Sequence, residues 1–275
     1  MPAPTTVPAG AASAPPGAAA LARAVLHAEW IKLRTVRSTF WSLLTAALLT
    51  LATGAALCLL TRYAARELEP ADRAALDPTA TSLSGMLLGE LAMVLFGVLA
   101  ASGEFATGML GTSVQAVPQR GLLLSCKAAV VFTVALLTGC ATSLTTFLTG
   151  QAVLGDLATS LTAPGVLRAV LGGGLYLAML ALFALGVATA LRHALLALGL
   201  LVPLFFLVSP LLGALPATAR FAAYLPDAAG SHLTDVHPPT DGLGPWSGSA
   251  VLALWVAAAL AAAYVTLRAR DVRPG

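Results

Sequence analysis

The chain has 275 residues, of which 58% are hydrophobic and only 10% are charged, and its formal net charge is +3. Soluble globular domains carry roughly 25% charged residues, so this composition, with a mean hydropathy of +0.88, excludes an ordinary soluble domain and indicates an integral membrane protein. The dominance of alanine, leucine and glycine favours closely packed membrane helices over barrel strands, which would alternate apolar and polar residues.

Residues 1–19 are uncharged and rich in proline and alanine, which predicts a disordered tail. This segment has no basic stretch followed by an apolar core. We therefore expect no cleaved signal peptide and an uncleaved first span.

Residues 20–37 predict a helix in the membrane interface, with its tryptophan and basic side chains at the level of the lipid headgroups. On a helical wheel, one half carries Leu21, Val25, Leu26, Trp30, Leu33 and Val36, and the opposite half carries Arg23, His27 and Arg34. Glu29 and Lys32 interrupt the apolar half, and a glutamate does not snorkel easily, so we expect this face to contact protein as well as lipid. The alternative is that the segment is only a basic flank that orients the first span.

Six stretches that are nearly free of charge are long enough to cross a hydrocarbon core, which needs about 20 apolar residues. They lie between Arg37 and Arg62, Asp77 and Glu104, Lys127 and Asp156, Arg168 and Arg192, His193 and Arg220, and Asp241 and Arg268. Because Arg192 and His193 are the only strongly polar break between the fourth and fifth stretches, we expect a very tight turn there.

The distribution of basic residues predicts the orientation of these spans. One side carries Arg23, Lys32, Arg34, Arg37, Arg120, Lys127, Arg192, Arg268, Arg270 and Arg273, and the other carries Arg62, Arg66, Arg73, Arg168 and Arg220. The richer side is expected to be cytoplasmic, which places both termini in the cytoplasm. Because topology explains these positions, the positive charge gives no reason to expect a nucleic-acid partner.

Residues 103–121, GEFATGMLGTSVQAVPQRG, form a polar segment between the second and third spans. Gly103, Gly108 and Gly111 allow tight turns, and Pro118 ends any helix formed within the segment. The pattern fits a short helix on the membrane surface, which a cytosolic partner could grip to move the two spans. An ordinary interhelical loop is the alternative.

Glu90 is the only acidic residue inside a predicted span, where a charge is costly and a functional role is the default hypothesis. It could line a translocation path or bind a proton. Alternatively, it is buried against a neighbouring helix and hydrogen-bonded to a hydroxyl or a backbone carbonyl. His232, Asp235 and His237 are candidate metal ligands by residue type, but their spacing matches no closed site, so we expect no metal.

No Walker A sequence, G-x-x-x-x-G-K-[ST], occurs in the chain, so we expect no ATP hydrolysis and no enzymatic activity of its own. Gly172, Gly173 and Gly174 lie in an apolar span without a lysine and predict close packing or a flexible point. The three cysteines show neither metal-ligand nor disulfide spacing and are expected to be packing residues.

Two segments, AEWIKLRTVRSTFW before the first span and GEFATGMLGTSVQAVPQR after the second, resemble the permease subunits of type-two ATP-binding-cassette exporters, especially actinobacterial ones. The resemblance extends over nearly the whole chain and rests on short motifs that follow in order along six spans. These motifs are Glu29, Lys32 and Arg34, then Gly103 and Glu104, Gly108, Pro118 with Arg120, and YLPDAAGSHL from Tyr224 to Leu233.

The resemblance implies an all-α integral membrane fold in which residues 20–37 form an elbow helix, residues 38–268 form a domain of six transmembrane helices and residues 269–275 form a cytoplasmic tail. The segment between spans two and three would be a cytoplasmic coupling helix that docks on an ATPase. Its expected contact residues are Gly103, Glu104, Phe105, Gly108, Pro118 and Arg120, and those of the elbow helix are Glu29, Trp30, Lys32 and Arg34.

We therefore expect the membrane-spanning subunit of an ATP-driven exporter in the plasma membrane. Two such chains, or this chain and a sister permease, would form the pathway within the lipid and dock separate ATPase subunits. ATP and Mg would be bound by those ATPase subunits, with no cofactor in this chain. An ATP-independent secondary transporter or channel is the main alternative, and a non-transporting anchor or sensor subunit is a third.

Overall fold

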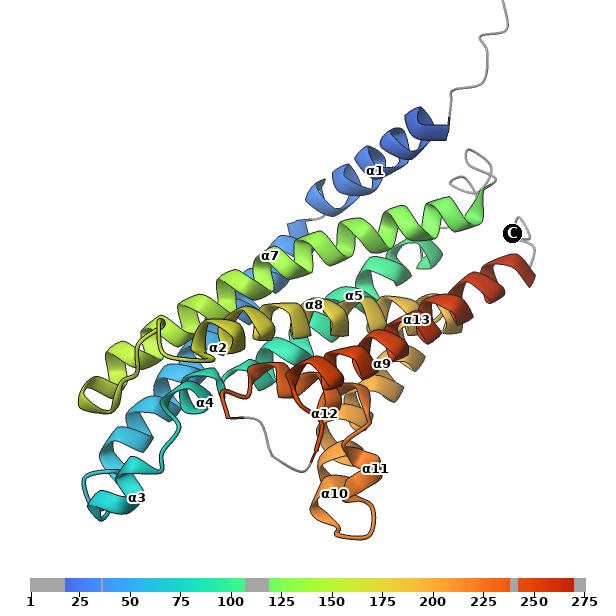
Figure 1. Cartoon of the computed structure of the whole chain (residues 1–275). Helices are drawn as coiled ribbons and strands as arrows, with labels where there is room; N and C mark the ends of the chain where they lie inside the picture. The colour runs from blue at the N-terminus through green and yellow to red at the C-terminus, as the bar shows by residue number, and fades with distance from the viewer. Residues whose placement is uncertain (1–17, 36, 107–118, 238–241, 270–275) are drawn as a thin grey trace, which may run out of the picture.

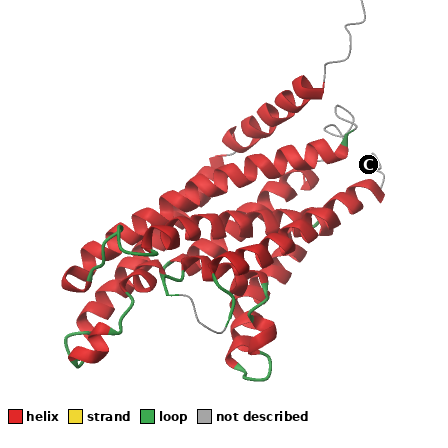
Figure 2. Ribbon diagram, viewed as in Figure 1, coloured by secondary structure: helices red, strands yellow, loops and turns green. Residues whose placement is uncertain are grey.

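The computed structural model describes residues 18–35, 37–106, 119–237 and 242–269 (Figure 1). Within these ranges every regular element is helical (Figure 2). The elements are α1 (Ala18–Thr35), α2 (Arg37–Ala64), α3 (Pro70–Ala74), α4 (Pro78–Leu83), α5 (Met86–Ala106), α7 (Arg120–Leu154), η1 (Gly155–Leu157), α8 (Val166–Leu191), α9 (Ala194–Pro203), η2 (Leu204–Val208), α10 (Ser209–Ala214), α11 (Ala219–Ala222), α12 (Pro226–Ser231), η3 (His232–Thr234) and α13 (Pro245–Ala269). Most of the predicted disordered tail and most of the predicted cytoplasmic tail lie outside the described residues.

Six helical stretches in the described part of the chain are long and apolar enough to cross a membrane, which confirms the six predicted spans. They are Leu43–Ala64, Met86–Gly103, Arg120–Leu157, Val166–Leu191, Ala194–Ala214 and Pro245–Ala269. The chain is therefore all-helical in its described parts, with the composition of a multi-pass membrane protein.

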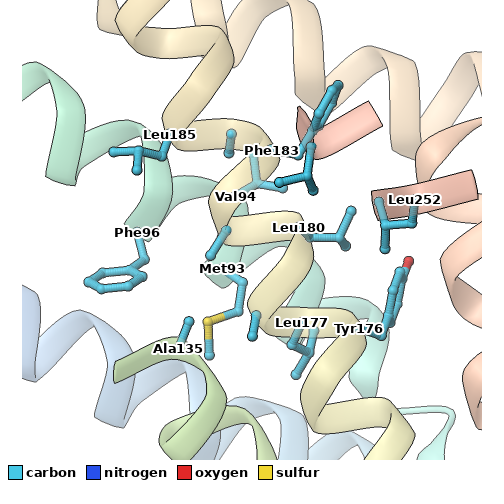
Figure 3. Packing of buried hydrophobic residues seen from close by; sticks show 14 of the residues in the cluster. Met93, Val94, Phe96, Ala135, Tyr176, Leu177, Leu180, Phe183, Leu185 and Leu252 are labelled. Atoms are coloured by element: carbon cyan, nitrogen blue, oxygen red, sulfur yellow. The ribbon is translucent and has the colours of Figure 1, made fainter. Parts of the chain in front are cut away.

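Helix α8 forms the centre of the bundle, with α5, α7 and α13 packed around it (Figure 1). In α8, 78% of the apolar span is buried, compared with no more than 44% in any other span. Met93 and Phe96 of α5 belong to the same buried apolar cluster as the side chains of α8, and Leu252 approaches α8 from α13 (Figure 3). Dispersion contacts and close approach hold such a core together, since lipid is as apolar as the side chains themselves.

Glycines allow α8 to approach its neighbours closely. A Cβ at Gly174 would lie 2.4 Å from Sγ of Cys140 on α7, and a Cβ at Gly172 would lie 2.5 Å from the carbonyl oxygen of Leu233. Contacts under 3.0 Å leave no room for a methyl group, so the glycine run of α8 serves close packing, as one of the two sequence interpretations predicted.

The turn between the fourth and fifth spans consists of Arg192 and His193. Arg192 adopts the left-handed conformation at the end of α8, with φ 55°, and the ring of His193 accepts a hydrogen bond from the backbone N–H of Leu196 to cap α9. This confirms the predicted tight turn. The fifth span is not one regular helix, because α9 ends at Pro203 and a π-helical turn, η2, separates it from α10.

The second span begins and ends later than the sequence suggests. Asp77 caps the short helix α4, and α5 begins only at Met86 after a break. Helix α5 then continues through Gly103 to Ala106, so the tight turn that Gly103 would allow is not formed there. A single glycine costs a helix only about 1 kcal/mol, which is too little to end one that packs along its length on α8.

The two ends of the bundle differ in character. Helix α1, the start of α7 and the end of α13 lie at the same end (Figure 1). We call this the basic end, and it also contains Arg192, whose guanidinium donates to the carbonyl of Thr266 at 3.3 Å. The opposite end carries the short elements α3 and α4 and the end of α7, and we call it the loop end (Figure 1).

Candidate functional site

Helix α1 is held against the first turns of α7 at the basic end. Val25 of α1 is buried together with Leu123 and Cys126 of α7. One turn further along α1, Glu29 is 3% exposed, and its Oε2 lies 2.6 Å from Nζ of Lys127. The face of α1 that the sequence indicated would meet protein therefore contacts α7, and Lys127 is the reason that a glutamate can lie there.

The carboxylate of Glu29 has a second basic partner on its own helix. Nζ of Lys32 lies 2.7 Å from Oε1, so each carboxylate oxygen accepts from a different ammonium group. A buried carboxylate is costly unless it is both paired and hydrogen-bonded. This three-residue cluster meets both conditions and links α1 to α7 through charge as well as through apolar packing.

Trp30 and Arg34, the other residues expected in the elbow helix, line an apolar groove. The groove has a volume of about 810 Å³ and lies between α1, α2 and α7, where Trp41 and Val134 also line it. Trp30 remains 43% exposed. A tryptophan beside an arginine at such a position suits the headgroup level of a bilayer.

Arg120 is the first residue of α7, and its guanidinium donates hydrogen bonds to the backbone carbonyls of Leu267 and Arg268 at the end of α13. The last carbonyls of a helix have no partner within the helix, so a cationic donor stabilises them. Arg120 thereby ties the polar segment before α7 to the last turn of α13. A polar hollow of about 700 Å³ opens beside this contact, lined partly by Tyr264.

The remaining residues expected to contact an ATPase are only partly described. Gly103 is exposed in the last turns of α5, and the backbone of Glu104 and Phe105 continues the same helix. Gly108 and Pro118 lie outside the described residues, so the predicted coupling helix stays a prediction.

The second polar site lies within the bundle around Glu90. Its carboxyl group lies beside the hydroxyl of Tyr176, a residue that is 2% exposed. Glu90 is half-buried, and its place beside a hydroxyl of a neighbouring helix agrees in part with the alternative of a buried, hydrogen-bonded glutamate. Asp227 of α12 lies close enough for its charge to act on both groups.

Asp227, which lies within the motif from Tyr224 to Leu233, is only 8% exposed. Burial raises the pKa of its carboxyl, while hydrogen bonds from Ser209 and from the backbone of Asp227 and Ala228 oppose the rise. Its Oδ1 is buried and accepts no hydrogen bond. The sequence signal was its place directly after Pro226, since a proline there begins the helix that carries Asp227 into the bundle.

The histidines of the last loop are not gathered into one site. Nδ1 of His232 lies 2.7 Å from Oδ2 of Asp235, while His237 lies 3.8 Å from Asp77. Among the residues that the structure describes, no three His, Cys, Asp or Glu side chains are grouped in a way that could hold a metal ion.

Comparison with known proteins adds no assignment. No protein-family model and no curated protein matches the chain. The assignment of a function therefore depends on the sequence motifs and on the geometry described above.

Proposed function

We propose that this chain is the membrane-spanning permease subunit of an ATP-driven exporter, and that ATP and Mg are bound by separate ATPase subunits. The supporting observation is that the two segments with the family resemblance meet on α7. Glu29 of the first segment binds Lys127, and the second segment leads directly into Arg120 at the start of the same helix. The two segments begin about 75 residues apart in sequence. If each served only to orient the neighbouring span, nothing would require both to contact the start of the same helix.

In this proposal, the segment between α5 and α7 is the coupling helix and α1 is the elbow helix. Helix α7 is continuous over 35 residues, so a force applied at its start moves it as one body. The Glu29 cluster makes α1 follow, and Arg120 passes the movement to the end of α13. Closure of the partner ATPases would in this way shift elements around α8 and alternate access to the pathway.

The proposed location is the plasma membrane with both termini in the cytoplasm, and the proposed assembly contains a second permease chain, identical or related. An ion-coupled secondary transporter is the second candidate. It is favoured by the half-buried Glu90, by the buried Tyr176 and Asp227 and by the π-helical interruption of the fifth span, because secondary transporters place ion sites at broken helices.

Co-purification tests the proposal. The tagged full chain is extracted gently from its native membrane, and the proteins that accompany it are identified. A variant with Glu104→Ala and Arg120→Ala is purified in parallel. The matched control carries Arg66→Ala and Glu67→Ala, which remove the same two kinds of charge from exposed positions between α2 and α3 at the loop end.

We expect a soluble ATPase with the unaltered chain and with the control, and its loss from the Glu104 and Arg120 variant. The single variant Glu104→Ala separates loss of partner contact from any loosening of α13 caused by Arg120→Ala. The absence of an ATPase from the unaltered chain, or its retention by the double variant, contradicts the proposal. In that case ion-driven transport becomes the function to test.

A further inference from the structure

A polar cluster of four residues from four different elements lies inside the bundle, away from the basic end. Glu90 comes from α5, Tyr176 from α8, Ser209 from α10 and Asp227 from α12. The hydroxyl of Tyr176 lies beside Glu90, and that of Ser209 lies beside Asp227. Tyr176 extends from α8 beside Leu252 of α13, at the junction where α12 also packs (Figure 3).

This cluster holds two carboxyl groups and no cation that pairs with them. Among the described residues, no lysine, arginine or histidine forms an ion pair with Glu90 or Asp227. Arg168 of α8 is a cation in the same region of the fold, and its guanidinium donates to the carbonyls of the segment after α12, including that of Asp235 at 2.6 Å. His232 of η3 is bound to Asp235.

The other helices packed around the cluster supply no compensating charge. Helix α13 presents Leu252 to the junction of α8 and α12. Helices α2, α7 and α9 pack against α5, and in their described parts no titratable group acts on Glu90. Tyr176 and Asp227 are the described groups that do so.

Tight packing around α12 prevents water from hydrating the carboxyl group of Asp227 in place of a cation. A Cβ at Gly230 of α12 would lie 2.5 Å from the ring of Tyr176 and 2.6 Å from Leu252. A Cβ at Gly248 of α13 would lie 2.2 Å from the carbonyl oxygen of Ala229. Helix α12 thus fits between α8 and α13 without spare space, and Oδ1 of Asp227 is enclosed there without a hydrogen-bond donor.

We propose that Glu90 and Asp227 form a proton-binding pair inside the bundle, and that its proton keeps α12 docked between α8 and α13. Two unpaired carboxylates in an apolar interior repel each other and lose their hydration, whereas a neutral carboxyl group avoids most of both penalties. The proton is taken from water and forms an O–H bond on one carboxylate oxygen, and Oδ1 of Asp227 is the oxygen left free to receive it. Release of the proton leaves both groups charged and loosens α12.

This inference is independent of the proposed exporter function, since it needs neither ATP nor a partner. It is tested on the full chain in lipid nanodiscs by infrared spectroscopy across a pH series. The absorption of protonated carboxyl groups is measured at each pH, together with hydrogen exchange of the α12 amides. The exchange rates of the α12 amides are divided by those of the α8 amides at the same pH. The variants are Glu90→Gln and Asp227→Asn, and the control is Asp72→Asn in the exposed helix α3.

In the unaltered chain we expect a protonated carboxyl band that persists at neutral pH and is lost in alkali, and α12 exchange that rises several-fold as the band disappears. Either variant should remove the band or move its titration to lower pH, and the control should leave it unchanged. A heavy carbon isotope in the aspartate carboxyl groups identifies the part of the band due to Asp227 without a mutation, in case a variant fails to fold.

Three outcomes would overturn the inference. The first is a chain with no protonated carboxyl band at neutral pH. The second is a band that survives in both folded variants. The third is loss of the band on adding sodium ions at constant pH, because the pair would then hold a metal cation instead of a proton.

Discussion

The buried cluster around Glu29 allows a quantitative test of how α1 is attached to the bundle. The change is Glu29→Leu, which leaves the ammonium group of Lys127 buried beside α1 without that carboxylate. Two companion variants complete a thermodynamic cycle, namely Lys127→Leu and the double variant.

The expected magnitudes follow from burial. The side chain of Glu29 is 4% exposed and that of Lys127 is 10% exposed. Removing one partner of a buried pair costs about 3–5 kcal/mol, because the other charge stays buried, and Glu29→Leu should lose this much docking energy. Lys127→Leu should lose only about 1.5–3 kcal/mol, the contribution of one hydrogen bond to a charged group, since Lys32 still binds the carboxylate. The double variant should lie close to the unaltered chain, because an apolar pair often replaces a buried ion pair without loss.

Hydrogen exchange of the α1 amides measures this docking energy, with α8 as the internal reference. Glu29→Leu should accelerate exchange in α1 by roughly two to four orders of magnitude, since each 1.4 kcal/mol corresponds to about tenfold in an equilibrium constant. The reasoning fails if exchange in α1 changes less than about threefold. It also fails if the double variant is as labile as Glu29→Leu.

Three further changes test other parts of the structure. Gly97→Ala places a Cβ 2.2 Å from the carbonyl oxygen of Ala181 and should destabilise the chain by about 1–3 kcal/mol, measured by unfolding in detergent. Gly199→Ala is its control, because no atom lies within 4 Å of the added Cβ, and it should be neutral or stabilise α9 by up to about 1 kcal/mol. Burial raises the pKa of Asp227, so the folded chain retains a proton that the unfolded chain releases, and stability should fall as the pH rises through the ordinary aspartate range toward the raised pKa. Asp227→Asn should abolish this loss, and the stability difference between the two chains should be near zero below a pH of about 4 and grow above it. Arg120→Ala should speed exchange in the last turn of α13 by roughly tenfold or more, the loss expected for hydrogen bonds from a charged donor worth about 1.5–3 kcal/mol, with little change in α8.

The sequence predicted the spans well because membrane insertion depends on local composition. The six apolar stretches, and the tight turn at Arg192 and His193, are visible in single windows of the chain. The anomaly of Glu29 on an apolar face was visible too, but its partner Lys127 is 98 residues away and no local pattern connects them.

The polar cluster around Glu90 shows the same limit more clearly. The sequence offered a hydroxyl as one of the alternative partners of Glu90, but not the identity of Tyr176, which is one of many apolar-compatible residues in α8. Asp227 resembled a loop residue because α12 is too short for a helical period to stand out. Its burial is created by three-dimensional contacts through Gly230 and Gly248, and such contacts leave no periodic trace in sequence.

Helix α7 is too long to be contained in the hydrocarbon core of a bilayer. At 1.5 Å per residue its 35 residues extend about 52 Å, whereas a hydrocarbon core is about 30 Å thick. Even a tilt of 40°, the upper end of the usual range, leaves about 40 Å along the membrane normal. About 10 Å of rigid helix must therefore lie beyond the hydrocarbon core, at the level of the headgroups, roughly the length from Arg120 to Lys127 if this part is at the basic end. The chain would then present a rigid helix end at the level of the headgroups, and anything that contacts its tip would act at the membrane surface.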